Sequence, residues 1–97
     1  MAFRYEFQEA AAKDLFKLTQ RDHPLLHAIA TTHIPAILKD PYALGEPKKG
    51  KLAAVRAYDL KVKNVAYRLN YAIEGDVVRF IAIGPHDEAY ARAERRI

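Results

Sequence analysis

The alternation of apolar and polar residues predicts helices in the first half of the chain. Residues 4–7 alternate polar and apolar, which predicts a short opening strand. In residues 8–20 apolar side chains recur every three or four positions, which predicts an amphipathic helix. A second helix is predicted over residues 24–39, with a kink or break at Pro35, because proline lacks the N–H that a helix interior needs. Residues 42–50 are rich in glycine, proline and lysine and predict a loop.

From residue 53 onward the pattern changes to that of extended chain. Residues 53–60, 66–74 and 77–84 predict three strands, the last of them dense in valine, isoleucine and phenylalanine. Glu74-Gly75-Asp76 predicts a tight hairpin turn between the last two strands, because glycine adopts backbone angles that other residues avoid. Residues 87–96 predict a final turn or helix.

This element order, β-α-α-β-β-β, predicts an α+β fold in which two N-terminal helices pack on one face of an antiparallel sheet. A chain of 97 residues is expected to form a single domain, residues 1–97. Strict alternation along residues 66–74 places Arg68 and Asn70 on the face opposite the tyrosines. The aromatic side chains expected in the core are Tyr5, Phe7, Phe16, Tyr71 and Phe80.

Composition narrows the class of protein. Hydrophobic residues make up 51% and charged residues 29% of the chain, as in folded domains and unlike disordered ones. No apolar run is long enough for a membrane span or a secretory signal, so a cytoplasmic protein is expected. The absence of cysteine excludes disulfides, thiolate metal sites and cysteine nucleophiles. His23 and His27 are four residues apart but have no third ligand nearby, so neither a metal nor another cofactor is predicted.

Positive charge is concentrated in one third of the chain. Residues 47–68 hold seven basic residues and one acidic residue, a net charge of +6, while the rest of the chain carries −2. Such a concentration attracts polyanions, although a solvated lysine-rich surface is the alternative interpretation. If the polyanion is RNA, the residues expected to contact its phosphates are Lys48, Lys49, Lys51, Arg56 and Lys63.

Candidate chemistry lies after the last strand. Gly84-Pro85 turns the chain and sets His86 on a loop, and Tyr90 follows four residues later, on the same face of a helix if one begins there. Lys61 and Arg68 come from neighbouring predicted strands. Cleavage of RNA without a metal needs a base for the 2′-hydroxyl, cations for the phosphorane and an acid for the leaving oxygen, and these residue types can supply them. The structural alternative is that His86 caps the helix and Tyr90 covers the core.

The chain resembles the RelE/ParE superfamily, the toxins of type II toxin–antitoxin systems. The resemblance covers the element order, the Ala66-Tyr67-Arg68-Leu69-Asn70-Tyr71 strand, the strand of residues 77–84 and the segment of residues 90–97. In RelE-type ribonucleases the arginine of a Tyr-Arg-Leu-x-Tyr strand is functional, and Arg68 occupies that position. Lys61 falls at a strand lysine and Tyr90 at a base-stacking tyrosine, while the spacing of His86 and Tyr90 is similar to that in YafQ-like relatives.

By this resemblance the protein is a ribosome-dependent, metal-independent endonuclease that cuts mRNA in the ribosomal A site and inhibits translation. His86 would then be an acid or a base, Lys61 and Arg68 would stabilise the phosphate, and Tyr90 would stack on a nucleotide. The chain departs from the RelE-like pattern in carrying Asp59 where a basic residue is usual, and His86 near the place of an arginine. Asp59 is either a general base or a partner that orients a neighbouring cation (Lys61 or Arg56).

Two other functions fit the same resemblance. The ParE branch poisons DNA gyrase and is not a nuclease, and some relatives keep the fold as inactive nucleic-acid-binding modules. In every case the resemblance implies a cognate antitoxin as a protein partner. Its amphipathic helix and extended tail are expected to cover the basic face and to occupy a groove between the first helix and the sheet.

Overall fold

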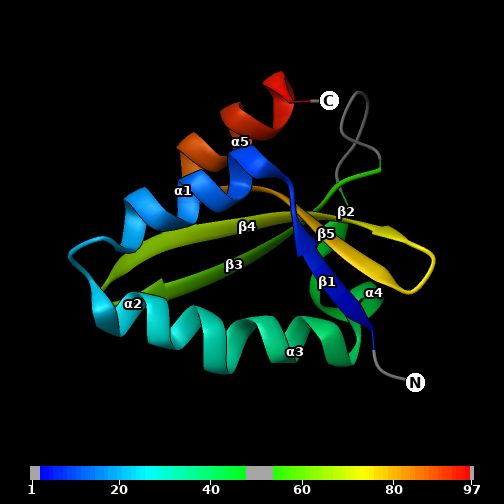
Figure 1. Ribbon diagram of the computed structural model, residues 1–97, viewed down its shortest axis with the longest axis horizontal. Helices are drawn as coiled ribbons and strands as arrows, with labels where there is room; N and C mark the ends of the chain where they lie inside the picture. The colour runs from blue at the N-terminus through cyan, green and yellow to red at the C-terminus, as the bar shows by residue number, and fades with distance from the viewer. Residues whose placement is uncertain (1–2, 48–53, 97) are drawn as a thin grey trace.

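A five-stranded mixed sheet organises the chain in the computed structural model, which describes residues 3–47 and 54–96 (Figure 1). The strands are β1 (Arg4–Phe7), β2 (Glu46–Pro47), β3 (Arg56–Val62), β4 (Val65–Glu74) and β5 (Val77–Pro85), in the spatial order β1-β5-β4-β3-β2. The strands β2 to β5 pair antiparallel, as predicted, but β1 runs parallel to β5. The helical connection returns the chain so that β3 starts in the direction of β1, and two hairpin reversals give β5 that direction again. The predicted α+β fold is therefore confirmed, with a mixed rather than a purely antiparallel sheet.

Six helical segments are described. They are α1 (Glu9–Thr19), α2 (His23–Ala28), the π-helical segment η1 (Ile29–His33), α3 (Ile34–Lys39), α4 (Pro41–Leu44) and α5 (His86–Arg95). The break predicted at Pro35 is present as the widened turn η1, in which the Ile34 N–H donates to the Ile29 carbonyl. Helix α4 lies where a loop was predicted, because the Asp40 carboxylate caps it by accepting from the Ala43 N–H at 3.2 Å. Within the described ranges, no helix combines the length and apolarity needed to cross a membrane.

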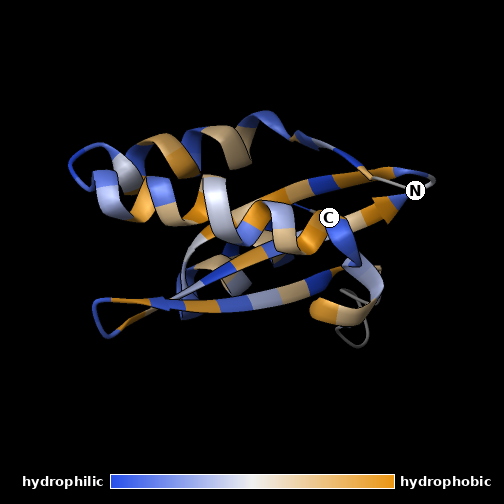
Figure 2. Cartoon of the chain, turned by 90° about the horizontal axis from the view of Figure 1, so that it is seen from below, coloured by the Kyte–Doolittle hydropathy of each residue, from blue (hydrophilic) through white to orange (hydrophobic). Residues whose placement is uncertain are grey.

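The main core lies on the sheet face covered by α2, η1 and α3. Its fully buried side chains include Leu25, Ile29, Ile37, Leu69, Tyr71, Val78, Phe80 and Ile83, joined by Ala11 of α1. Hydrophobic and hydrophilic positions alternate along the strands, as Figure 2 shows. Two aromatic residues predicted to be buried are exposed: Tyr5 to 50% on the edge strand β1, and Phe16 to 66% on the outer side of α1. An edge strand and an outward helix face leave such side chains without a second layer to cover them.

Helix α5 covers the opposite face of the sheet. Its Ala93 belongs to a second, smaller core with Val55, Ile81 and Ala82, and its Ala89 is also fully buried. The buried side chain of Asn70 donates to the Ala89 carbonyl at 3.0 Å and so ties β4 to α5. Asn70 thus points away from the tyrosines, as the alternation predicted.

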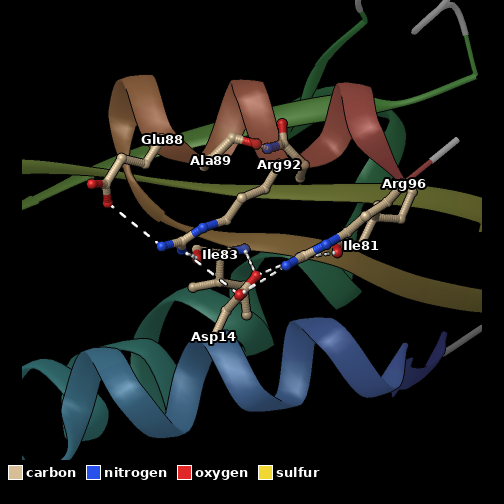
Figure 3. Close-up of polar contacts among 8 residues, drawn as sticks. Asp14, Ile81, Ile83, Glu88, Ala89, Arg92 and Arg96 are labelled. Atoms are coloured by element: carbon tan, nitrogen blue, oxygen red, sulfur yellow. Dashed lines mark hydrogen bonds and ion pairs between the residues drawn. The ribbon is translucent and has the colours of Figure 1, made fainter.

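Side chains from α1 and α5 cover the outer edge of β5 beyond the end of β1 (Figure 3). The Asp14 carboxylate accepts from the Ile83 N–H at 3.1 Å and from both terminal nitrogens of Arg96 at 2.6 and 3.0 Å. Arg92 donates to the Ile83 carbonyl at 2.8 Å, and Arg96 to the Ile81 carbonyl at 3.0 Å. These bonds satisfy an otherwise open strand edge and hold the C-terminal half of α5, the helix that also carries His86 and Tyr90.

Candidate functional site

Three side chains far apart in the sequence meet on the face of the sheet that α5 covers. Asp59 of β3 and Arg68 of β4 are direct register partners, and His86 is the first residue of α5, directly after β5. The Arg68 Nε donates to Asp59 Oδ1 at 2.7 Å and Nη2 donates to Oδ2 at 3.2 Å, a bidentate pair. The same Nη2 lies 2.5 Å from His86 Nε2. Arg68 thus contacts the first residue of the terminal helix.

These contacts assign hydrogen-bonding roles to the two nitrogens of the imidazole. An arginine side chain only donates hydrogen bonds, so the Nε2 atom of His86 accepts from Arg68 and carries no proton. The proton of the neutral ring is then on Nδ1, which lies 3.1 Å from Asp87 Oδ1 and donates to it. His86 consequently presents the lone pair of Nε2 to the Arg68 guanidinium.

The members of this group differ in exposure. The Arg68 side chain is 9% exposed, whereas those of His86 and Asp59 are 43% and 52% exposed. The cation is therefore fixed within the sheet, and the imidazole and carboxylate form its solvent-facing side. An anion from solvent would approach this cation from the side on which Asp59 already pairs with it.

Lys61 and Tyr90 flank this group. Lys61 is exposed on β3, two residues after Asp59, so both project from the same face of the sheet. Tyr90 is 42% exposed and lies one helical turn after His86 in α5, as the predicted four-residue spacing requires.

Comparison with known families and structures assigns the chain to a family. The ParE-like toxins of type II bacterial toxin–antitoxin systems match residues 7–94. The chain belongs to this family of toxins. Searches of curated proteins gave no significant match.

Solved structures share the fold of this toxin. A toxin–antitoxin complex, RelBE2 from Mycobacterium tuberculosis, contains a chain with a TM-score of 0.70 and 22% identity, covering 88% of this chain and 99% of that one. A mutant of the Escherichia coli toxin RelE in the free state has a TM-score of 0.68 and 27% identity, covering 100% and 99%. The protein HP0894 from Helicobacter pylori has a TM-score of 0.57 and 20% identity, covering 88% and 96%. The fold is thus RelE-like.

The predicted RNA-binding residues of the toxin lie in different surroundings. Lys63 is exposed in the turn between β3 and β4, with a φ of 51°. Arg56 donates from Nε to the Gly45 carbonyl at 3.0 Å and from Nη2 to the Tyr42 carbonyl at 2.5 Å, so its guanidinium already fastens the segment before β2. A role for Arg56 and Lys63 in RNA binding stays a prediction. Three further predicted residues, Lys48, Lys49 and Lys51, lie outside the described residues.

Two features of the toxin were not anticipated. Asp87 accepts a hydrogen bond from the His86 ring and so orients it. In the sequence, only the position of Asp87 directly after His86 could have indicated this contact. A cavity of about 380 Å³ lies between α1 and α5, lined by Asp14, Lys17, Leu18, Pro85, Glu88, Arg92 and Arg96. In the sequence, this cavity could have been indicated by Asp14, an acidic residue at one of the apolar positions of an amphipathic helix. The described part of the toxin contains no cluster of three side chains suited to a metal ion.

A second histidine of the toxin is paired on the opposite face of the sheet. His33 Nδ1 and the Tyr58 hydroxyl share a hydrogen bond of 2.8 Å between η1 and β3. Burial lowers the pKa of His33 and raises the pKa of Tyr58, because it disfavours the charged form of each group. His33 is therefore held neutral and apart from the group that contains His86.

Proposed function

We propose that this toxin is a ribosome-dependent endoribonuclease that cuts mRNA in the A site of cytoplasmic ribosomes without a metal ion. The observation that carries the proposal is the contact between Arg68 Nη2 and His86 Nε2, beside the Asp59 carboxylate. It joins a fixed cation to an unprotonated imidazole nitrogen at a half-open surface. A phosphodiester bound there would meet a charge and a base together.

The proposed reaction is an intramolecular transfer at phosphorus. The 2′-oxygen of one nucleotide attacks the adjacent phosphorus while its proton passes to His86 Nε2, and the bond to the 5′-oxygen breaks. Arg68 stabilises the extra negative charge of the phosphorane, and Lys61 adds positive charge from the same sheet face. The products are a 2′,3′-cyclic phosphate and a 5′-hydroxyl, whose proton comes from water. Tyr90 offers an exposed ring on which a neighbouring base stacks.

A purified translation system tests this function. Arg68→Ala and His86→Ala should each slow site-specific mRNA cleavage by roughly 100-fold or more, because each removes a group that acts on the reacting atoms. His23→Ala is the matched control, since His23 is an exposed histidine at the start of α2 and should not matter. Full cleavage by both site variants, or equal cleavage of free mRNA without ribosomes, would contradict the proposal.

Poisoning of DNA gyrase is the second candidate function, and it is favoured by the family match to ParE-like toxins. The two activities leave different products. DNA breaks that require gyrase, with no mRNA cleavage, would establish the second candidate. Binding of RNA with neither product would indicate an inactive relative.

We further propose a cognate antitoxin as the protein partner of this toxin. The M. tuberculosis structure is described as a toxin–antitoxin complex, which supports the proposal by similarity of fold. The exposed Phe16 of α1 and Tyr5 of β1 offer apolar surface to an amphipathic helix near the first helix and the sheet. Co-expression of the toxin with the neighbouring open reading frame should relieve growth arrest.

A further inference from the structure

The bond between Asp59 and Arg68 has the geometry of an arginine–phosphate contact. Two parallel bonds, of 2.7 and 3.2 Å, join two nitrogens of the guanidinium to two oxygens of one carboxylate. Carboxylates and phosphates present the same pair of oxygens to the planar fork of arginine. The Asp59 carboxylate therefore occupies the position that two oxygens of a phosphodiester would take on this side of Arg68.

Little of the Arg68 guanidinium is left for a second anion. Nε and Nη2 donate to Asp59, and Nη2 also donates to His86. Nη1 has no hydrogen-bond partner within the described ranges, and no side-chain nitrogen there is both buried and unpaired, so Nη1 reaches solvent. A phosphate can approach Nη1 alone, whereas a bidentate grip through Nε and Nη2 requires Asp59 to move away.

Asp59 is the more exposed partner of the pair. Its side chain is 52% exposed, so water can solvate the carboxylate once the pair opens. The Arg68 side chain is 9% exposed on β4, which has neighbouring strands on both sides. If a phosphate replaces the Asp59 carboxylate, the buried Arg68 cation is paired with an anion both before and after the exchange. The large cost of leaving a buried charge unpaired is therefore avoided.

The exchange would place the phosphate beside the imidazole. Nη2 has two N–H groups and directs one to Asp59 Oδ2 and the other to His86 Nε2. A phosphate that replaces the carboxylate takes the first N–H, and the imidazole gives up the second before it accepts the 2′-hydroxyl proton.

We propose that Asp59 is a positioning residue that holds the phosphate subsite closed and is displaced by the RNA backbone, and that it is not the general base. This inference rests on the proposed function, since it assigns the occupant of that same site. It decides between the two roles that the sequence left open for Asp59. It also gives Asp59 a partner, Arg68, that was not foreseen for it.

The test measures RNA affinity separately from cleavage. The probe is a short RNA with a 2′-deoxy nucleotide at the cut position, which binds but cannot react. Asp59→Asn keeps the shape of the side chain and removes its charge, so affinity should rise about three- to tenfold, because the anion that competes with phosphate for Arg68 is gone. Asp59→Glu keeps the charge and should bind as the parent does. Asp59→Ala serves as a second neutral variant if the asparagine variant unfolds.

A double variant makes the result specific to the exchange. In an Arg68→Ala background, Asp59→Asn should raise affinity by much less, because the cation that the two anions share is gone. Unchanged or weaker affinity in Asp59→Asn, or no detectable binding by any variant, would overturn the inference. A cleavage rate that collapses while affinity stays unchanged would identify Asp59 as the general base. Because the probe cannot be cut, a failure of ribosomal cleavage leaves this comparison of affinities intact.

Discussion

At the scale of single residues, burial separates side chains of the same type into different roles. Arg68 and Arg56 both come from the basic segment, yet Arg68 pairs with Asp59 and His86 while Arg56 holds two backbone carbonyls. Strand alternation predicts that Arg68 leaves the tyrosine face, but it cannot predict which acid will lie opposite. That pairing depends on the register between β3 and β4, and register is set by the turn between them.

The residue scale also carries a prediction about His33. Burial lowers the pKa of His33, so at a pH just below its ordinary pKa of 6.5 this residue binds a proton more readily in the unfolded chain than in the folded one. The free energy of unfolding should therefore be highest above pH 6.5 and should fall as the pH drops toward the lowered pKa of His33. His33→Gln keeps a polar partner for Tyr58 without the titration, so it should lose less stability between about pH 7.5 and about pH 5.

Urea unfolding at the two pH values measures this difference. His23→Gln, a substitution of a surface histidine, is the control and should behave as the parent protein. An identical loss of stability in His33→Gln and in the parent would show that His33 does not contribute.

At the scale of elements, alternation and helical spacing predicted the long segments well. The hairpin between β4 and β5 forms where Gly75 was expected to allow it, with a φ of 61°. The short elements α4 and β2 were missed, since four and two residues are too few to show a period. The π-helical form of η1 was missed for a related reason: proline indicates that a helix is interrupted but does not specify how.

The hydrogen bonds between Asp14 of α1 and Arg96 at the end of α5 give the prediction at this scale. Asp14→Asn removes the charge that pairs with the partly buried Arg96, so the protein should lose about 2–4 kcal/mol of stability. Amide exchange should accelerate in α5 more than in α3, because only α5 is fastened by these bonds.

The matched control removes an exposed acid on the same helix. Glu9 pairs with Lys13 at 3.3 Å with both side chains largely exposed, so Glu9→Gln should cost no more than about 0.5 kcal/mol. Equal losses of stability from the two substitutions would mean that the bonds between Asp14 and Arg96 do not stabilise α5.

At the scale of the whole molecule, the fold gathers charge that the sequence spreads out. Lys61 and Lys63 lie at the β3–β4 end of the sheet, while Arg92 and Arg96 meet Lys17 around the cavity between α1 and α5. The first group follows from the count of charges along the chain. The second group does not, because it forms only when the first and last helices lie side by side.

Salt dependence tests whether the β3–β4 end contacts the RNA backbone. Each cation that neutralises a phosphate of a single strand adds about 0.7 to the slope of log affinity against log salt concentration. Lys63→Ala should lower the slope by about that amount for the uncleavable RNA, whereas Lys39→Ala, at the end of α3, should not. Equal slopes for Lys63→Ala and the parent would exclude Lys63 from the contact.

The pairing of β1 with β5 has a consequence for the biosynthesis of the protein. β1 is translated early, yet its neighbour in the sheet is the last strand, so β1 must wait until β5 has left the exit tunnel. Arg68 likewise cannot meet His86 before the beginning of α5 emerges. A nascent chain thus lacks both its completed sheet and the assembled group of Asp59, Arg68 and His86 until the last part of the chain has been synthesised.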